Sequence, residues 1–464
     1  MRTNNSTMKL PEILAPAGNF DKFRTAIQYG ATAVYLGGEN GNLRAASCGL
    51  SKNELKQAVK LAEAKGASLF YCLNSFPFEN DLNALPAVIE EAAECGVHAF
   101  IIADPGLLRL LRKYAPRHPV HLSTQSNTTN SEAVKFWLDQ GVCRVNLARE
   151  LDYRQIHSIR QNCPEAELEV FVHGAMCLAV SGQCLLSAWL NKRPANQGQC
   201  TQPCRFEYKA LETAVSAKQD SGSACNPNSI ELTVEEALRP GKALWQVEQN
   251  EGYSAFWAPD DLCLLPYLPW FIHTGATTLK IEGRTKSASY VAHVADVYSS
   301  ALKAAAVIAG QAAPDSAVHP QDLSFDYLPY LAELLQNSSR QLTSGFFLPE
   351  ERVDICRMAA NAGLEHTPGK QSSVLARFVE PASPDATSWI IDVKENWNAE
   401  TPAELMLPGM KRPLLQSGSY ALENHRGESS SQVSCGTRAV LHLGSEAAEQ
   451  LANIEPGIFI RRRG

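Results

Sequence analysis

Four cysteines near the middle of the chain have the residue type and the spacing of a metal site. Cys177, Cys184, Cys200 and Cys204 follow the pattern C-x6-C-x15-C-x3-C. Four thiolates hold iron–sulfur clusters, and sulfur ligands also suit zinc. Structural zinc sites usually combine two C-x2-4-C pairs, and only Cys200 and Cys204 have that spacing. The pattern favours an iron–sulfur cluster, with a zinc site or four separate thiols as alternatives.

One position argues against radical S-adenosylmethionine chemistry. The C-x3-C-x2-C motif of that chemistry would need a cysteine at the position of Glu207.

The N-terminal residues MRTNNSTMKLPE lack the apolar core of a signal peptide, and no apolar run reaches the roughly 18 residues of a membrane span. We therefore expect a cytoplasmic protein without a membrane span, in which the thirteen cysteines form no disulfide framework.

A recurring pattern of helix, glycine and short apolar strand is expected to position these cysteines. It occurs at residues 29–38, 65–74, 95–104, 140–149 and 274–284. Glycine can end a helix in the left-handed conformation, and the apolar run after it suits a strand buried on both faces. Three further strands are expected at 12–18, 120–127 and 168–174.

Eight strands that alternate with helices predict an α/β fold, a TIM-like (β/α)8 barrel. A doubly wound open sheet is the alternative, although no G-x-G-x-x-G motif follows the first strand. Active sites of such barrels lie at the carboxyl ends of the strands. The polar residues at those ends are Asn74, Asp104, Gln125, Arg149, Glu150, His173, Lys280, Glu282 and Arg284. They are candidates for a pocket, although some could cap the next helix or form structural ion pairs.

The chain is expected to divide into three regions. The barrel spans 10–310 and contains a Cys-rich insertion at 175–275, a helical linker region follows at 311–366, and a small C-terminal β-barrel domain spans 367–464. Strands of this last domain are expected at 373–380, 388–396, 403–409, 438–444 and 457–463. The last three arginines, Arg461 to Arg463, could contact phosphate, but a solvated tail is the simpler interpretation.

The residues around the first cysteine pair resemble a known family. Glu169–Ser187 fits E-x-F-x-x-G-(S/A)-x-C-x4-G-x-C-x-(L/I/V/M)-S, the pattern of the U32, or collagenase-like, peptidases. LPEILAPAGNFDKFRTAIQYGATAVYLGG, DLCLLPYLPWFIHTGATTLKIEGRTKS and RQLTSGFF agree with that family, so the resemblance covers roughly residues 10–350. The run NQGQCTQPCRF is most similar to the subgroup that hydroxylates the wobble uridine of tRNA.

The resemblance implies a function and a cofactor. Members of the subgroup make 5-hydroxyuridine, with prephenate as the hydroxyl source and without molecular oxygen, whereas relatives modify 23S rRNA or ubiquinone precursors. Their 4Fe-4S cluster is held by four cysteines that match Cys177, Cys184, Cys200 and Cys204 here. Cys263, in a DLC motif, is a competing ligand that ranks behind Cys204. Where relatives often carry Ser-Lys-Asp-Leu, this chain has Pro-Asp-Asp-Leu at 259–262, which adds a carboxylate beside the pocket.

Strand-end position and family resemblance together suggest roles for individual residues. Lys280 and Arg284 can pair with carboxylates or phosphates, and Glu282 or His173 can move protons. Asn74, Gln125 and Arg149 are expected to bind substrate. The net charge of −7 gives no general nucleic-acid-binding surface, so tRNA would need a local basic patch.

Two rival functions remain open at this point. A peptidase is the family's historical label, but the chain has neither an HExxH zinc motif nor a G-x-S-x-G elbow. A cysteine nucleophile would have to be Cys177 paired with His173. A non-catalytic scaffold with a structural cluster is the other rival.

Overall fold

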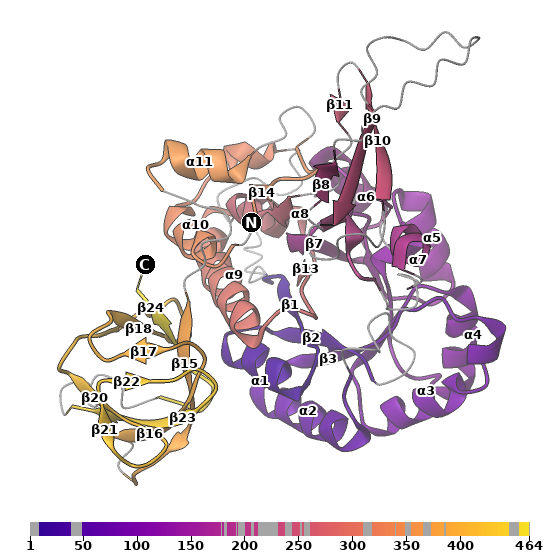
Figure 1. Ribbon diagram of the computed structural model, residues 1–464. Coiled ribbons are helices and arrows are strands. Elements are labelled where there is room, and N and C mark those ends of the chain that lie inside the picture. The colour runs from indigo at the N-terminus through magenta and orange to yellow at the C-terminus, as the bar shows by residue number, and fades with distance from the viewer. Residues whose placement is uncertain are drawn as a thin grey trace, which may run out of the picture.

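The structure is a computed structural model, and the element bounds below refer to the residues it describes (Figure 1). The described residues are 9–38, 49–177, 179–180, 183–191, 193, 200–205, 208–211, 231–236, 244–250, 253–254, 260–309, 318–338, 340–348, 354–364, 373–384, 387–444 and 454–463.

Eight parallel strands among these residues form a closed barrel. They are β1 (Glu12–Pro16), β2 (Ala33–Leu36), β3 (Ser68–Leu73), β4 (Ala99–Ile102), β5 (Val120–Leu122), β6 (Arg144–Asn146), β7 (Glu167–Ala175) and β13 (Thr278–Ile281). Each of the first seven strands pairs with the next, and β13 pairs with both β1 and β7. All eight strands predicted from the sequence are present. The predicted TIM-like barrel is confirmed and the open sheet is excluded.

Helices cover the outside of the barrel (Figure 1). They are α1 (Phe20–Gln28), α2 (Lys52–Lys65), α3 (Leu85–Glu94), α4 (Pro105–Tyr114), α5 (Ser131–Asp139), α6 (Tyr153–Asn162), α8 (Leu268–Thr274) and α9 (Ala288–Ala309). Helix α2 shows why they form where they do. Ser51 and Glu54 make a reciprocal capping box at its start, and Gly66 ends it in the left-handed conformation.

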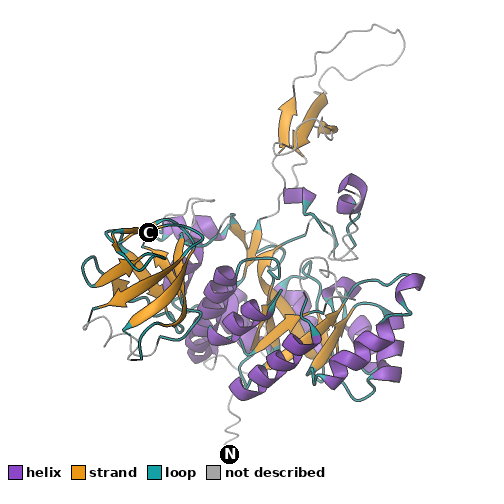
Figure 2. Ribbon diagram, turned by 60° about the horizontal axis from the view of Figure 1, so that its bottom comes forward, coloured by secondary structure: helices purple, strands orange, loops and turns teal. Residues whose placement is uncertain are grey.

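The insertion between β7 and β13 leaves the barrel and returns to it. It contains α7 (Leu186–Asn191), a 3₁₀ turn at Pro203–Arg205, and an antiparallel sheet of β8 (Tyr208–Leu211), β9 (Glu231–Glu236), β10 (Leu244–Asn250) and β11 (Tyr253–Ser254). This sheet projects away from the barrel (Figure 2). The chain then forms β12 (Asp261–Cys263), which lies antiparallel to β7 and parallel to β14 (Leu342–Thr343).

The C-terminal part of the chain is an antiparallel half-barrel beside the (β/α)8 barrel (Figure 1). Helices α10 (Leu328–Leu335) and α11 (Ile355–Asn361) precede it. Its main sheet has the strand order β19-β18-β24-β15-β16-β23-β20-β21. These strands, with the short pair β17 and β22, are β15 (Val374–Pro381), β16 (Ser388–Val393), β17 (Trp397–Asn398), β18 (Ala403–Met406), β19 (Leu414–Leu415), β20 (Tyr420–Glu423), β21 (Ser429–Ser430), β22 (Gln432–Val433), β23 (Arg438–Leu443) and β24 (Phe459–Arg462). The five strands predicted from the sequence are all in the main sheet.

A buried ion-pair network joins the half-barrel to the helices of the main barrel. Glu333 of α10 pairs with Arg412 at 2.7 Å and with Arg461 at 2.9 Å. Arg412 also pairs with Asp296 of α9, and Arg461 with Glu404. Arg461 is only 2% exposed, so the prediction of a solvated tail is wrong for this residue. Its charge is paired with carboxylates inside the protein.

Helix α9 packs on the barrel and also contacts the half-barrel through Asp296. Among the described helices it is long and apolar enough, with a mean hydropathy of 1.2 over its best 18 residues, to cross a membrane. The buried central helix of a soluble protein passes the same test, and 61% of that window of α9 is buried. It packs against α1, α8 and α10, so its apolar residues have a structural explanation within the fold.

Candidate functional site

A buried ion pair crosses the inside of the barrel. Glu169 of β7 and Lys280 of β13 lie 2.7 Å apart and are 1% and 4% exposed. The Lys280 ammonium also lies 4.5 Å from the ring centroid of Tyr35 and 5.3 Å from that of Phe171. Burying two charges costs free energy even when they are paired. Apolar side chains would fill this part of the barrel core without that cost. The pair is therefore a candidate for a functional role.

Two further cations flank the same two rings. The Arg149 guanidinium stacks on Phe171 at 3.7 Å, and the Arg284 guanidinium lies 5.8 Å from the ring of Tyr35. Arg149 also donates a hydrogen bond to the Ala175 carbonyl, two residues before Cys177. The structure thus brings the predicted residues Arg149, Lys280 and Arg284 together around Tyr35 and Phe171, at the carboxyl ends of the strands.

The amino-terminal end of the barrel is closed by a separate set of charges. Arg144 of β6 pairs with Glu12 at 2.5 Å and with Glu167 at 2.7 Å. His121 of β5 is the register partner of Arg144, and its pKa is lowered well below its usual value by burial, with smaller contributions from Arg144 and Lys280. His121 is therefore a neutral imidazole at pH 7.

Several buried polar atoms in this region have no hydrogen-bond partner within the described residues. They are Asn74 Oδ1, His121 Nδ1, Gln125 Nε2, both amide atoms of Asn146, Arg149 Nε, Glu150 Oε2 and Glu169 Oε2. Buried polar atoms are nearly always paired in folded proteins, with protein groups or with bound water or ligand. Such a concentration inside the barrel and at the carboxyl ends of its strands indicates a candidate site for a polar ligand. It includes the predicted residues Asn74 and Gln125.

Asp104 caps a helix, which was the alternative role expected for polar residues at strand ends. Its carboxylate accepts a hydrogen bond from the Leu107 backbone amide and caps α4.

Glu169 and Asn146 were not predicted as site residues, because they lie within strands. A polar residue in an otherwise apolar strand was the signal that could have found them.

His173 lies apart from the other predicted residues. The pairing of β7 with β13 shifts by one residue, so that Lys280 faces Phe171 but Ile281 faces His173, and Val172 is the extra residue of a β-bulge. In a regular strand His173 would share a face with Glu169 and Phe171. The bulge instead turns its ring toward α9, where it contacts Tyr298.

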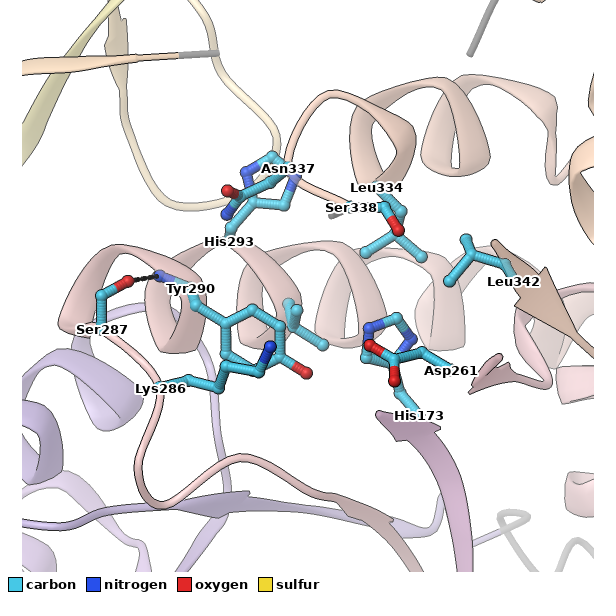
Figure 3. Close-up of a pocket in the computed structure, with 11 residues that line it drawn as sticks. His173, Asp261, Lys286, Ser287, Tyr290, His293, Leu334, Asn337, Ser338 and Leu342 are labelled. Carbon is cyan, nitrogen blue, oxygen red and sulfur yellow. Dashed lines mark hydrogen bonds between the residues drawn. The ribbon is translucent and has the colours of Figure 1, made fainter. Parts of the chain in front are cut away.

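A small pocket of about 110 Å³ lies beside His173, outside the barrel. Figure 3 shows His173 and Asp261 on one side of it and Tyr290 and Lys286 on the other. Burial lowers the pKa of His173 to about 4, against the opposing effect of the Asp261 carboxylate. His173 is therefore neutral at pH 7 and separated from the barrel interior by the strand that carries it.

Glu282 follows β13 and fixes the end of β7. Its backbone amide donates to the His173 carbonyl at 2.9 Å, and its own carbonyl accepts from the Tyr290 hydroxyl at 3.1 Å. Opposite it, Gly174 has a φ of +105°, and an added Cβ would lie 2.7 Å from the Glu282 carbonyl oxygen. Only glycine fits this crossing without displacing the backbone that leads to Cys177.

Replacing Gly174 with alanine should therefore destabilise the protein strongly. The matched control is Gly66→Ala, because Gly66 has a φ of +66° but no atom within 4 Å of an added Cβ. Urea unfolding should show a loss of about 1 kcal/mol for the control, from the left-handed backbone alone. The loss for Gly174→Ala should be at least about 3 kcal/mol. Equal losses would contradict the close approach of Glu282.

The four cysteines follow directly from the end of β7. Cys177 and Cys200 are exposed, Cys184 and Cys204 are half-buried, and none of the eleven described cysteines is in a disulfide. Thr201 anchors the second pair to α7, since its amide donates to Ser187 Oγ at 3.0 Å and its hydroxyl accepts from Asn191. The Gln202 amide donates to Cys200 Sγ at 3.4 Å.

The donor types fit a 4Fe-4S cluster, since four thiols and a backbone amide directed at a sulfur are its usual surroundings. Their arrangement is more open than a bound cluster requires. Nowhere in the part of the chain that the structure describes do three His, Cys, Asp or Glu side chains converge as around a metal ion.

Cys263 differs from these four cysteines in its surroundings. It is fully buried on β12, with its sulfur 3.8 Å from the Tyr298 hydroxyl. Burial raises the pKa of its thiol to about 11. A metal ligand must be a thiolate, so these surroundings favour Cys204 over Cys263 as the fourth ligand.

The fold defines a TIM-like barrel protein, with a candidate ligand-binding site at the carboxyl ends of its strands. The sequence matches the profile of Peptidase family U32 over residues 18–355, and the chain belongs to this family.

Similar proteins have names that concern RNA hydroxylation. The tRNA hydroxylation protein P of Escherichia coli is 37% identical over 314 residues, which are 64% of this chain and 68% of that protein. The tRNA hydroxylation protein P1 of Bacillus subtilis is 31% identical over 388 residues, 84% of this chain and 79% of that protein. A 23S rRNA 5-hydroxycytidine synthase of Escherichia coli is 32% identical over 293 residues, 63% of this chain and 39% of that protein.

Proposed function

We propose that this protein is an RNA-modifying hydroxylase that forms 5-hydroxyuridine at the wobble position of tRNA, with prephenate as the hydroxyl source. The observation that carries the proposal is the set of unpartnered polar atoms inside a barrel whose mouth holds Arg149, Lys280 and Arg284. The names of the similar proteins support RNA as the substrate. Modification of tRNA would take place in the cytoplasm.

A base of structured RNA has to leave its stack before an enzyme can reach its ring carbons. The rings of Tyr35 and Phe171 hold the cations at the mouth of the barrel, where the base would enter. Arg149 and Arg284 suit carboxylates and phosphates because a guanidinium can bind them in a bidentate way. Prephenate is a dicarboxylic acid, so these two arginines are its proposed partners.

Glu282 is the proposed proton-transfer group at the mouth, because His173 faces the outside of the barrel. Cys177, Cys184, Cys200 and Cys204 would hold a 4Fe-4S cluster. When bound, such a cluster would supply electrons or bind an oxygen-bearing donor. The hydrogen bond from Arg149 to Ala175 connects the barrel mouth with the segment that ends at Cys177, so the two parts of the site would be neighbours.

The test combines nucleoside mass spectrometry with iron analysis. In a strain that lacks the gene, 5-hydroxyuridine should disappear from tRNA and return with the wild-type gene. Cys177→Ser and Cys200→Ser should restore less than about a tenth of it, and the anaerobically purified variants should lose iron, because thiolates are the cluster ligands. Cys435→Ser is the control, since Cys435 is also exposed but lies in the half-barrel.

Full 5-hydroxyuridine levels in the cysteine variants would disprove the role of the cluster. Unchanged tRNA in the deletion strain, with 5-hydroxycytidine lost from 23S rRNA or a ubiquinone precursor accumulating, would assign the related substrates instead. Cleavage of gelatin by iron-free protein would support the peptidase alternative.

A further inference from the structure

Asn146 and Glu169 are neighbours in the barrel wall that do not bond to each other. They are register partners of the parallel strands β6 and β7, and each is 1% exposed. Glu169 faces the interior, where it pairs with Lys280. Asn146 shares its face with Arg144, two residues earlier, whose guanidinium lies over the ring of Phe70 inside the barrel.

The hydrogen-bonding atoms of this pair remain unused within the described residues. The Asn146 amide has an unpartnered donor and an unpartnered acceptor, and Glu169 has one unpartnered oxygen because Lys280 bonds to the other. Just after β5, Ser123 donates to Gln125 Oε1, which fixes the orientation of that amide and leaves Gln125 Nε2 unpartnered. A ligand here must therefore both donate and accept hydrogen bonds.

The charges around the pair favour a neutral ligand. Lys280 is the nearest cation, and Glu169 offsets it at 2.7 Å. A dianion would have to separate this pair in a dry environment, which is costly. A neutral ring edge with an N–H group between two carbonyl groups meets the requirement without that cost, and the edge of uracil has this arrangement.

We propose that Asn146 and Glu169 read the edge of the target uridine. Glu169 accepts the N3–H group, the Asn146 amide donates to the adjacent carbonyl, and Gln125 is placed to donate to the other. This inference rests on the proposed function for the choice of uridine among the bases. It also predicts that cytidine binds poorly, since its N3 carries no hydrogen and would face the Glu169 carboxylate.

The substitution Asn146→Leu distinguishes a role of the amide in recognising the base from a role in folding. Leucine has the same branching and the same number of side-chain heavy atoms, and removing a buried amide that lacks partners should leave the melting temperature unchanged or raise it. Loss of its hydrogen bonds to the base should reduce 5-hydroxyuridine in tRNA of the complemented deletion strain by about 10- to 100-fold. Asn146→Val, a smaller residue that favours strands, is the second variant in case leucine does not fit.

The control is Thr274→Val. Thr274 also carries a buried hydroxyl without a partner in the described residues, but it ends α8, at the opposite end of β13. Its variant should keep full 5-hydroxyuridine levels. The second readout is binding of the purified variant to an unmodified anticodon stem-loop with uridine or with cytidine at the wobble position. The wild type should prefer uridine, and Asn146→Leu should remove most of that preference.

The outcomes distinguish this inference from the function on which it rests. A wild-type gene that restores no 5-hydroxyuridine would disprove the proposed function. A wild-type gene that restores it, together with Asn146 variants that restore it equally and bind uridine as the wild type does, would disprove only the base-reading role. A melting temperature that falls by several degrees in both Asn146 variants, with the uridine preference retained, would show that the amide is structural.

Discussion

Replacing Lys280 with methionine should abolish 5-hydroxyuridine formation and lower the free energy of unfolding by about 3–5 kcal/mol. The reason is the Glu169 carboxylate, which is 1% exposed and would lose the ammonium that lies 2.7 Å away. A single buried charge without a partner is far less favourable than a pair. The loss should appear in urea unfolding of the purified protein.

The chain contains a natural control for this experiment. Lys135 and Glu132 are also 2.7 Å apart, but their side chains are 44% and 80% exposed on α5. Lys135→Met should cost less than about 1 kcal/mol, because water screens a surface ion pair. The double variant Lys280→Met with Glu169→Gln should recover much of the stability but no activity. Recovery of both would mean that the pair only supports the barrel.

Replacing Glu333 with alanine should destabilise the protein by about 3 kcal/mol or more. Burial by itself raises the pKa of this carboxyl, but His293, Arg461 and Arg412 lower it to about 2, so it is ionised at neutral pH. The substitution leaves Arg412 and Arg461 with one carboxylate each, Asp296 and Glu404. The Arg461 guanidinium would remain buried and the Arg412 guanidinium largely buried, each with fewer hydrogen bonds.

The expected result is an earlier thermal transition and faster proteolysis of the half-barrel than in the wild type. Glu395→Ala is the control, because Glu395 pairs with Arg462 at 3.2 Å on the surface of the same domain. Its melting temperature should stay close to that of the wild type. If the two variants have the same melting temperature, the buried network does not hold the half-barrel in place.

The barrel could be predicted because its signals are local. Each strand is a short apolar run, and α2 is bounded by the capping residues Ser51 and Gly66. Residues at strand ends, such as Gln125, Arg149 and Lys280, could be predicted for the same reason. Their position depends only on where the strand stops.

The rest of the site depends on features that the sequence pattern does not contain. Strands of a parallel barrel are buried on both faces, so apolar periodicity does not show that Asn146 and Glu169 face the interior. A bulge at Val172 reverses the expected direction of His173. Arg461 is buried because carboxylates from residues 333 and 404 meet it in the folded protein. Such distant contacts follow from the complete fold only.

The closure of the barrel has a consequence for synthesis on the ribosome. Strand β1 pairs with β13, and the contact between Glu12 and Thr278 spans 266 residues of chain. At about 5–20 residues per second, the ribosome needs roughly 13–50 s to produce the second partner after the first. During that interval the nascent chain exposes the outer edge of β1, and an unpaired strand edge invites association with other chains. A long insertion ahead of the last strand therefore extends the period in which nascent chains depend on chaperones.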